Sequence, residues 1–356
     1  MISESSNCQD NIISKDKTII EAIKILDGLV IKALFVVDDT RIICASLTDG
    51  DIRRAILAGV DLGSTVDSIA NHSFTFVYDK YSIDEVDELM LDKGITVIPV
   101  IDSDKHIIRI LYKRYVRKRS YIDKVHIPVV IMAGGKGTRL YPYTKILPKP
   151  LIPIDDIPIC ERIINLSSEA GCNQFFIIVN YKKNMIKAYF ADAKLECDIE
   201  FIDEDIPLGT GGGLKLLEGK LDNTFIMTNS DILIMEDVGR IVNHHVKENN
   251  DVTMVCSLKN FEIPYGTVEF TEGGEIVSFN EKPKLNFFTN TGYYIAEPCI
   301  MDYIGDNESI DMPDVIERMR TDGKRVGVYP ISDSLWLDMG QFDSMENMER
   351  RLKSNI

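Results

Sequence analysis

Two sequence patterns alternate along residues 128–258, and this alternation constrains the fold most strongly. Short runs of branched and aromatic residues, typical of buried strands, are separated by stretches with apolar residues at helical spacing. The strand-like runs are PVVIM (128–132), FFIIV (175–179), IEFI (199–202), TFIMT (224–228) and VTMVCSL (252–258). The helix-like stretches are CERIINLSSEAG (160–171), KNMIKAYFADA (183–193) and DVGRIVNHHVKEN (237–249). The alternation predicts an α/β, Rossmann-like fold with a mixed, mainly parallel sheet, and ligands beyond the carboxyl ends of its strands.

A repeat with an offset of 64 residues occupies the first third of the chain. Thr18 corresponds to Ser82, and Asp38 corresponds to Asp102. In each copy, a capped helix precedes a β-branched strand, a turn with aspartates and a second strand. Because a unit of this size buries its apolar face poorly alone, we expect the two copies to pack together.

This repeat resembles a tandem pair of CBS domains. The repeats fall at about residues 8–60 and 72–118 of a unit that spans residues 1–120. The resemblance implies a site for an adenine nucleotide, in which Thr48 and Asp51 would hold a ribose and a phosphate at the start of a helix. A second interpretation stays open, in which Thr48 only caps that helix and the pair is structural or forms a dimer.

Composition argues against several classes of function. The formal net charge of −16 disfavours a partner made of nucleic acid. We expect no membrane span, since no run of roughly 18 apolar residues occurs, and no signal peptide. The seven cysteines are scattered without a CxxC pair, which favours reduced thiols and a cytoplasmic location. His244 and His245 are adjacent rather than spaced as metal ligands on a helix, so we expect them to be surface polar residues.

The first loop after a predicted strand concentrates glycine and positive charge. It lies within VVIMAGGKGTRLYPYTKILPKPLIPI, residues 129–154. The glycines required by a Walker A loop or a Rossmann fingerprint are missing, but the ingredients suit a polyanion. Glycines let backbone N–H groups approach phosphates, and Arg139 can grip phosphate oxygens with two hydrogen bonds. Pro148 and Pro150 restrain the backbone around Lys149.

Seven motifs, in order along residues 129–343, resemble those of the sugar-1-phosphate nucleotidylyltransferases. They are AGGKGTRLYPYTKILPKPLIPI, EDIPLGTGGGL, MTNSDIL, YGTVEF, VSFNEKP, NTGYYIAEP and WLDMGQFDSM. The resemblance implies a nucleotide-diphospho-sugar transferase fold for residues 127–356, joined to the CBS pair by a linker at residues 121–126. It also implies the reaction of a nucleoside triphosphate (NTP) with a sugar 1-phosphate, which gives a nucleotide sugar and pyrophosphate.

The same resemblance implies catalytic roles for four residues. Arg139 would stabilise the departing phosphates, and Lys149 would bridge the α-phosphate and the incoming phosphate. Asp231 and Asp338 would hold Mg²⁺, a cation that prefers carboxylate and phosphate oxygens. Little acid–base chemistry is needed, because the attacking phosphate is already ionised at neutral pH.

Two further sets of residues follow from the motifs. The nucleotide-binding set is Gly134, Gly135, Gly137, Thr138, Glu204, Gly209 and Thr210. The sugar-phosphate set is Gly266, Glu281, Lys282 and Asn290. The Glu204 carboxylate favours GTP, because guanine offers two donor groups on one edge whereas uracil and thymine offer one.

The domain order also resembles that of the guanylyltransferases of bacterial legionaminic-acid biosynthesis, and this favours glucosamine 1-phosphate as the sugar substrate. Two alternatives stay open. The first is an enzyme of the same fold that uses UTP or dTTP, and the second is a nucleotide-sensing regulatory protein with an inactive transferase domain. The presence of all four catalytic candidates argues against the second alternative. We expect the protein to be a homo-oligomer.

Overall fold

The computed structural model describes residues 2–5, 8–29, 31–113, 124–340, 345, 348–350 and 352. The chain divides into two compact units, Met1–Arg119 and Ser120–Ile356. Residues 114–123, which include the end of the second expected repeat and half of the expected linker, lie outside the described residues. Within the described part, none of the helices has the length and apolar character needed to cross a membrane.

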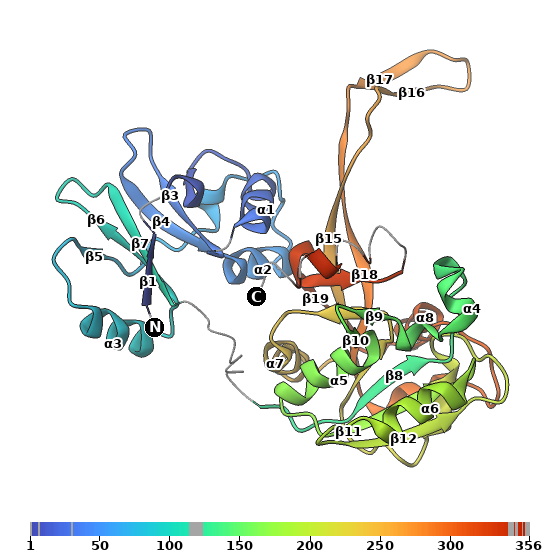
Figure 1. The fold of residues 1–356 in the computed structure, drawn as a ribbon. Coiled ribbons are helices and arrows are strands. Elements are labelled where there is room, and N and C mark those ends of the chain that lie inside the picture. Colours follow the sequence, from blue (N-terminus) through green and yellow to red (C-terminus); the bar gives the residue numbers. More distant parts are fainter. Residues whose placement is uncertain are drawn as a thin grey trace. The chain divides into compact units, whose positions relative to one another are not determined.

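The N-terminal unit consists of two similar halves (Figure 1). The first half contains β2 (Ile12–Ser14), α1 (Ile19–Gly28), β3 (Ala33–Val37), β4 (Ile43–Thr48) and α2 (Asp49–Leu57), with the sheet order β2-β3-β4. The second half contains β5 (Val77–Tyr78), α3 (Ile83–Lys93), β6 (Val97–Ile101) and β7 (Ile107–Lys113), and β1 (Ile2–Ser5) completes the order β1-β7-β6-β5. The expected repeat of helix, strand and strand is therefore confirmed.

Helix capping and packing in this unit also follow the sequence prediction. Thr18 accepts a hydrogen bond from the backbone N–H of Glu21, and Ser82 caps α3 in the same way. One hydrophobic cluster joins the two halves, because Phe35 of β3 packs with Ile101 and Ile110 of the second half. The two repeats thus share buried apolar surface, as expected from their size.

The C-terminal unit is built on a seven-stranded mixed sheet with the order β12-β11-β8-β13-β18-β15-β19. The strands are β8 (Val129–Ala133), β11 (Gln174–Val179), β12 (Asp198–Asp203), β13 (Phe225–Asn229), β15 (Val252–Glu262), β18 (Lys284–Ala296) and β19 (Val326–Ile331). Strands β12, β11, β8 and β13 run parallel, and β18 is antiparallel to both of its neighbours. All five strands expected from the sequence are present, which confirms the predicted α/β class.

Helices cover both faces of this sheet. They are α5 (Ile159–Glu169), α6 (Lys183–Asp192), α7 (Val238–Glu248) and α8 (Met312–Thr321). Alternate residues of β8 enter different cores: Val129 and Ile131 pack with α5, α6 and α7, whereas Val130 packs with α8. The three predicted helices coincide with α5, α6 and α7, so hydrophobic periodicity located these elements correctly.

The expectation for His245 is wrong. Its side chain is only 1% exposed, and its ring nitrogens lie 2.8 Å from Thr253 Oγ1 and 3.1 Å from Glu297 Oε1. The reason is helical spacing: Val238, Ile241 and His245 share the buried stripe of α7. His244 lies on the next position around the helix, where it is half-buried against Tyr329.

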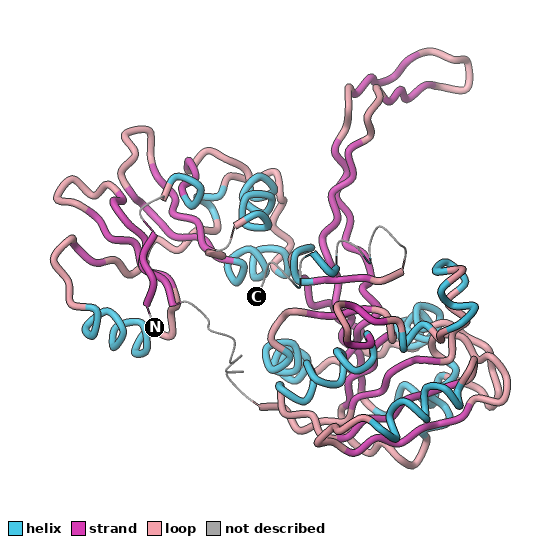
Figure 2. The backbone as a smooth tube through the Cα atoms, viewed as in Figure 1, coloured by secondary structure: helices cyan, strands magenta, loops and turns pink. Residues whose placement is uncertain are grey.

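Strands β15 and β18 continue beyond the sheet as a two-stranded ladder. Their pairing runs from Cys256↔Asn290 to Glu262↔Lys284 and leads into a hairpin of β16 (Thr267–Phe270) and β17 (Ile276–Asn280). We call residues 259–288 the arm. Figures 1 and 2 show the arm projecting away from the sheet.

The remaining short elements surround the sheet edge where the site lies. They are α4 (Tyr143–Ile146), the strand pairs β9 (Pro153–Ile154) with β10 (Ile157–Pro158) and β14 (Ile232–Ile234) with β20 (Trp336–Asp338), and the 3₁₀ turns Thr138–Leu140, Lys149–Leu151 and Gly212–Leu217.

Candidate active site

The glycine-rich loop after β8 folds back on itself at Gly137. This residue has φ +63°, and a Cβ there would lie 2.9 Å from Thr144 Cγ2 and 3.0 Å from Lys149 Cβ. Thr144 Oγ1 donates a hydrogen bond to the carbonyl of Gly137 at 3.0 Å, which ties α4 to the loop. A side chain at position 137 would therefore disturb both the turn and the position of Lys149.

A cavity of about 340 Å³ opens at the carboxyl ends of β8 and β13. All seven residues of the expected nucleotide set line it: Gly134, Gly135, Gly137, Thr138, Glu204, Gly209 and Thr210. Three of the four catalytic candidates, Arg139, Lys149 and Asp231, line it as well. The structure thus brings together residues spread over about a hundred positions of sequence, at the sheet edge where such folds bind ligands.

Glu204 is held in the wall of this cavity. Its side chain is 4% exposed, and burial raises its pKa to about 7. A Cβ on Gly134 would lie 2.5 Å from Glu204 Oε2, and a Cβ on Gly213 would lie 2.6 Å from Oε1. These two glycines therefore leave the space that the carboxyl group occupies. The sequence interpretation missed Gly213, although the run GTGGGL signalled close packing.

The turn at Gly209 and Thr210 is fixed against the segment before α8. Thr210 donates from its backbone N–H and from Oγ1 to Asp311 Oδ1, at 2.9 Å and 3.0 Å. Gly209 has φ +79°, and a Cβ there would lie 2.6 Å from the carbonyl oxygen of Ile310. Asp311 belongs to none of the seven motifs, so no sequence signal pointed to it.

Lys149 and the two aspartates lie close together, and the β14–β20 pair brings the aspartates to each other. Lys149 Nζ forms an ion pair with Asp231 Oδ2. Asp338 pairs with Ile232, the residue after Asp231, and Met339 N donates to the Asp231 carbonyl at 2.8 Å. Antiparallel pairing therefore brings together two aspartates that lie far apart in the sequence.

The electrostatics of these aspartates fit a cation. Burial and the nearby Asp231 carboxylate raise the pKa of Asp338, while Lys149 and Arg139 act in the opposite direction. A divalent cation would relieve the repulsion between the two carboxylates, and both offer the hard oxygen ligands that Mg²⁺ prefers. No group of three or more His, Cys, Asp or Glu residues suited to a metal occurs within the described residues. A cation at Asp231 and Asp338 would therefore take its other ligands from substrate and water.

A second cavity, of about 300 Å³, adjoins the first and shares Arg139, Thr210 and Asp231 with it. Asp338 and Asn290 line this second cavity, and so do residues that the sequence interpretation did not select, among them Tyr294, Asp311, Trp336 and Asn229, the last of which also lines the first cavity. Asn290 Nδ2 donates to Tyr294 Oη at 2.5 Å, which fixes its amide beside the two aspartates. The two cavities together offer space for two ligands side by side.

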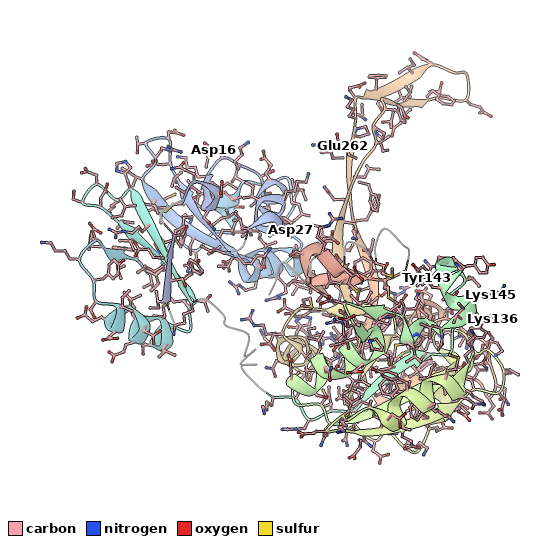
Figure 3. The ribbon with its side chains drawn as sticks, in the orientation of Figure 1. Asp16, Asp27, Lys136, Tyr143, Lys145 and Glu262 are labelled. Atoms are coloured by element: carbon pink, nitrogen blue, oxygen red, sulfur yellow. The ribbon has the colours of Figure 1, made fainter. Side chains whose placement is uncertain are left out.

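The rest of the expected sugar-phosphate set lies elsewhere. Gly266, Glu281 and Lys282 line neither cavity and are exposed on the arm. A Cβ on Gly266 would lie 2.9 Å from Glu281 Oε2, so these residues adjoin one another. In Figure 3, the label of Glu262 marks the arm, whereas Lys136 lies on the glycine-rich loop and Tyr143 and Lys145 lie on α4. The unbroken β15–β18 ladder carries the three residues away from Asn290.

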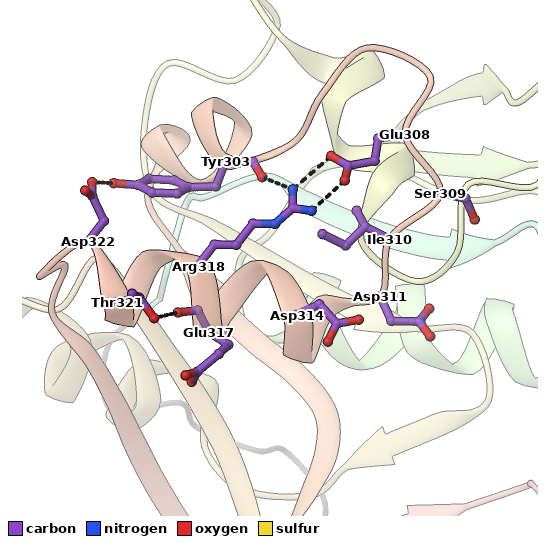
Figure 4. A pocket seen from close by; sticks show the side chains of 10 residues that line it. All are labelled: Tyr303, Glu308, Ser309, Ile310, Asp311, Asp314, Glu317, Arg318, Thr321 and Asp322. Atoms are coloured by element: carbon purple, nitrogen blue, oxygen red, sulfur yellow. Dashed lines mark hydrogen bonds and ion pairs between the residues drawn. The ribbon is translucent and has the colours of Figure 1, made fainter.

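A larger hollow of about 920 Å³ lies on α8 and does not suit a triphosphate (Figure 4). Five carboxylates line it: Glu308, Asp311, Asp314, Glu317 and Asp322. Its guanidinium, Arg318, already donates to both oxygens of Glu308, at 2.9 Å and 2.6 Å. Like-charge repulsion therefore favours the smaller cavities as the site for anionic substrates.

In the N-terminal unit, Thr48 and Asp51 form a helix cap. Asp51 Oδ2 accepts hydrogen bonds from Thr48 N at 2.8 Å and from Thr48 Oγ1 at 2.7 Å. Arg54 forms an ion pair with the other oxygen of Asp51. The structure shows this cap, and the nucleotide-binding role and the purely structural role of these residues both stay predictions.

Residues 128–355 match the family model described as nucleotidyl transferase, and residues 11–58 and 66–121 match that of the CBS domain. This chain belongs to the nucleotidyl transferase family. The transferase domain therefore follows a CBS pair in the chain.

Curated relatives agree with this assignment. A mannose-1-phosphate guanylyltransferase of Mycobacterium tuberculosis is 31% identical over 220 residues, which cover 60% of this chain and 61% of the relative. A UTP–glucose-1-phosphate uridylyltransferase of Synechocystis is 31% identical over 233 residues, 60% of each chain. A D-glycero-alpha-D-manno-heptose 1-phosphate guanylyltransferase of Aneurinibacillus thermoaerophilus is 30% identical over 231 residues, 64% of this chain and 99% of the relative. The chain thus spans about three fifths of the length of the first two relatives.

A solved structure shares the fold. HddC from Yersinia pseudotuberculosis superimposes with a TM-score of 0.50 at 21% identity, covering 64% of this chain and 99% of HddC.

Proposed function

We propose that this protein transfers a guanylyl group from GTP to a sugar 1-phosphate and releases pyrophosphate. One observation carries the proposal. A buried carboxyl group, a glycine-rich loop, two cationic side chains and two adjacent aspartates converge on the two joined cavities. This arrangement offers one place for a base, one for phosphates and one for a second anion beside them.

The nucleotide would bind in the 340 Å³ cavity. The Glu204 carboxylate accepts hydrogen bonds from the N1–H and N2–H₂ groups of guanine, an edge that pyrimidine bases lack. The backbone N–H groups of Gly135 and Thr138 face the phosphates at the loop. Arg139 then stabilises the charge that develops on the leaving pyrophosphate.

Chemistry takes place where the two cavities meet. Lys149 leaves its ion pair with Asp231 and contacts both the α-phosphate and the incoming phosphate, which lowers their mutual repulsion. A phosphate oxygen of the sugar substrate forms a bond to the α-phosphorus, and the bond from that phosphorus to the bridging oxygen of pyrophosphate breaks. No proton needs to move in this step. Asp231 and Asp338 would hold Mg²⁺, which when bound neutralises charge on phosphate oxygens.

The sugar is proposed to be glucosamine 1-phosphate. Besides the two expected metal ligands, a third carboxylate, that of Asp311, lines the 300 Å³ cavity. A carboxylate there suits a substrate with a protonated amine, because an ammonium group is a donor only. The CBS pair is proposed to bind an adenine nucleotide or to assist assembly, and a cytoplasmic location agrees with the free cysteines of the structure.

The test is an assay of pyrophosphate release with GTP, UTP, dTTP, CTP and ATP, each combined with the 1-phosphates of glucosamine, N-acetylglucosamine, glucose and mannose. We expect GTP with glucosamine 1-phosphate to give the highest kcat/KM. Fastest release with UTP or dTTP would support an enzyme of the same fold that uses one of these nucleotides, a possibility that the similarity to a uridylyltransferase favours. Binding of nucleotides without any release would contradict the proposal and favour a regulatory protein.

A further inference from the structure

The proposed sugar-phosphate residues are divided between two places in one chain. Asn290 lines the 300 Å³ cavity, whereas Glu281 and Lys282 lie at the far end of the ladder and are exposed. Among the described residues that line this cavity, Arg139 is the one cationic side chain, and the nucleotide cavity shares it; Lys149 lines the nucleotide cavity alone. The second anionic substrate therefore lacks part of its binding site within a single copy.

The arm is built in a way that keeps its far end away from its own cavity. From Cys256↔Asn290 outward, the β15–β18 register continues without a bulge to Glu262↔Lys284. At the base, Lys259 forms an ion pair with Asp333 at 2.5 Å and lies 4.7 Å from the centre of the Trp336 ring. We expect a continuous ladder held at its base to keep its direction, so that the residues beyond its end stay away from this cavity.

The arm also exposes an unusual amount of apolar surface. Ten large apolar side chains within residues 261–288 are exposed, including Phe270 at 69% and Phe279 at 62%. Apolar surface of this extent is expected at an interface with another protein. The hairpin at its end is acidic, since Glu269, Glu272 and Glu275 lie there.

The segment beside the nucleotide cavity has the complementary character, and it begins at Lys136, which lies between the lining residues Gly135 and Gly137. Tyr141 and Ile146 of this segment are large apolar residues that are exposed. Lys136 and Lys145 are exposed on the same segment and would face the acidic hairpin of an approaching arm. A second copy of this chain therefore offers both the apolar contact and the opposite charge that the arm requires.

We infer that the arm of one copy lies across the cavity mouth of a second copy, where Gly266, Glu281 and Lys282 complete the sugar-phosphate site. The inference rests on the proposed function for the roles of these residues. The second copy is the occupant that the structure favours, because the arm carries the groups that this chain's own cavity lacks. An active site then contains side chains from two subunits.

The first experiment is subunit complementation with the full-length chain. Asp231→Asn removes a proposed metal ligand and leaves the arm intact, whereas Lys282→Ala changes the arm and leaves the cavity intact. Each variant alone is expected to be strongly impaired. Co-expressed with different tags and purified through both tags, mixed pairs should recover about half of wild-type turnover, because one of the two sites in each pair combines an intact cavity with an intact arm. Mixed protein no more active than the better variant alone would overturn the inference.

A second experiment needs no activity. Equal amounts of ¹⁴N- and ¹⁵N-labelled chains are mixed, unfolded, refolded together and treated with an amine-reactive cross-linker, and the linked peptides are analysed by mass spectrometry. We expect mixed-isotope links between Lys282 and Lys136 or Lys145. Links between Lys183 and Lys187 of α6, which both pair with Asp203 of β12, should be of a single isotope and serve as the control.

Failure of this inference can be told apart from failure of the proposed function. If Lys282 links to these lysines only within single-isotope peptides, or not at all, the arm does not cross to a second copy. If the wild-type protein releases no pyrophosphate from any substrate pair, the proposed function fails, and the isotope pattern still decides the position of the arm.

Discussion

The nucleotide side and the sugar-phosphate side of the active site are built differently. The nucleotide cavity is formed at the edge of a packed sheet, and Glu204 is buried between two glycines there. Three of the four sugar-phosphate residues instead lie on an exposed two-stranded arm. The comparison teaches that, on the proposed function, one substrate would meet a site already in place, whereas the site of the other would be complete only when the arm docks.

The largest effect is expected at the point where both sides meet. Asp231→Asn should lower kcat for pyrophosphate release by about 10²–10³, because one preorganised charge at the reacting phosphates is lost. The fold should be retained, since Asp231 lies in the turn between β13 and β14. Steady-state kinetics with circular dichroism would check this, with Asp205→Asn, an exposed neighbour of the cavity, as the control. A rate equal to that of the wild type would remove Asp231 from the mechanism.

A smaller effect should be confined to the sugar-phosphate side. Lys282→Ala should lower kcat/KM for the sugar 1-phosphate by about 10–100-fold, the cost of one hydrogen bond to a charged group. The Kd for GTP should not change. Lys284→Ala, which removes an exposed ion pair with Glu262 on the same arm, is the control and should have little effect. Equal losses in GTP affinity and in kcat/KM would contradict the division into two sides.

A pH dependence should be confined to the nucleotide side. Since burial raises the pKa of Glu204 to about 7, the carboxyl group is largely protonated below that pH and ionises above it. Affinity for GTP should therefore increase as the pH rises, by about tenfold between pH 6 and 8. Calorimetry over this range would measure it. Glu204→Gln has no proton to lose and should show a flatter profile, and identical profiles for both proteins would refute the role of Glu204.

The smallest effect is expected for a helix cap in the N-terminal unit. Thr48→Ala should lower the free energy of unfolding of the N-terminal unit by about 1 kcal/mol, because it removes a helix cap. Turnover at saturating substrates should stay the same. Thermal unfolding with and without AMP would separate the two interpretations of this cap: stabilisation by AMP that is lost in the variant favours a nucleotide site, and equal responses favour a structural role.

Much of this architecture could be predicted from the sequence. The buried strands and helices of the transferase unit are long enough to show their periodicity, and the caps at Thr18 and Ser82 carry clear local signals. The nucleotide residues gather in one cavity because they follow strands that end at the same sheet edge.

The features that could not be predicted depend on contacts between residues far apart in the sequence, which no local pattern encodes. Asp311 reaches the site through hydrogen bonds to Thr210, a residue 101 positions away. His245 is buried because Thr253 and Glu297 satisfy its ring nitrogens. The arm could not be predicted from local sequence either, because the sequence of β15 and β18 does not show where their ladder leaves the sheet.

The most direct test of this two-sided account uses a shortened arm. Residues 261–285 would be replaced by an Asn-Gly turn, which closes the β15–β18 ladder near its base. We predict that this chain binds GTP with the Kd of the full protein and releases no pyrophosphate with any sugar 1-phosphate. Turnover close to that of the full protein, or loss of GTP binding, would contradict the account.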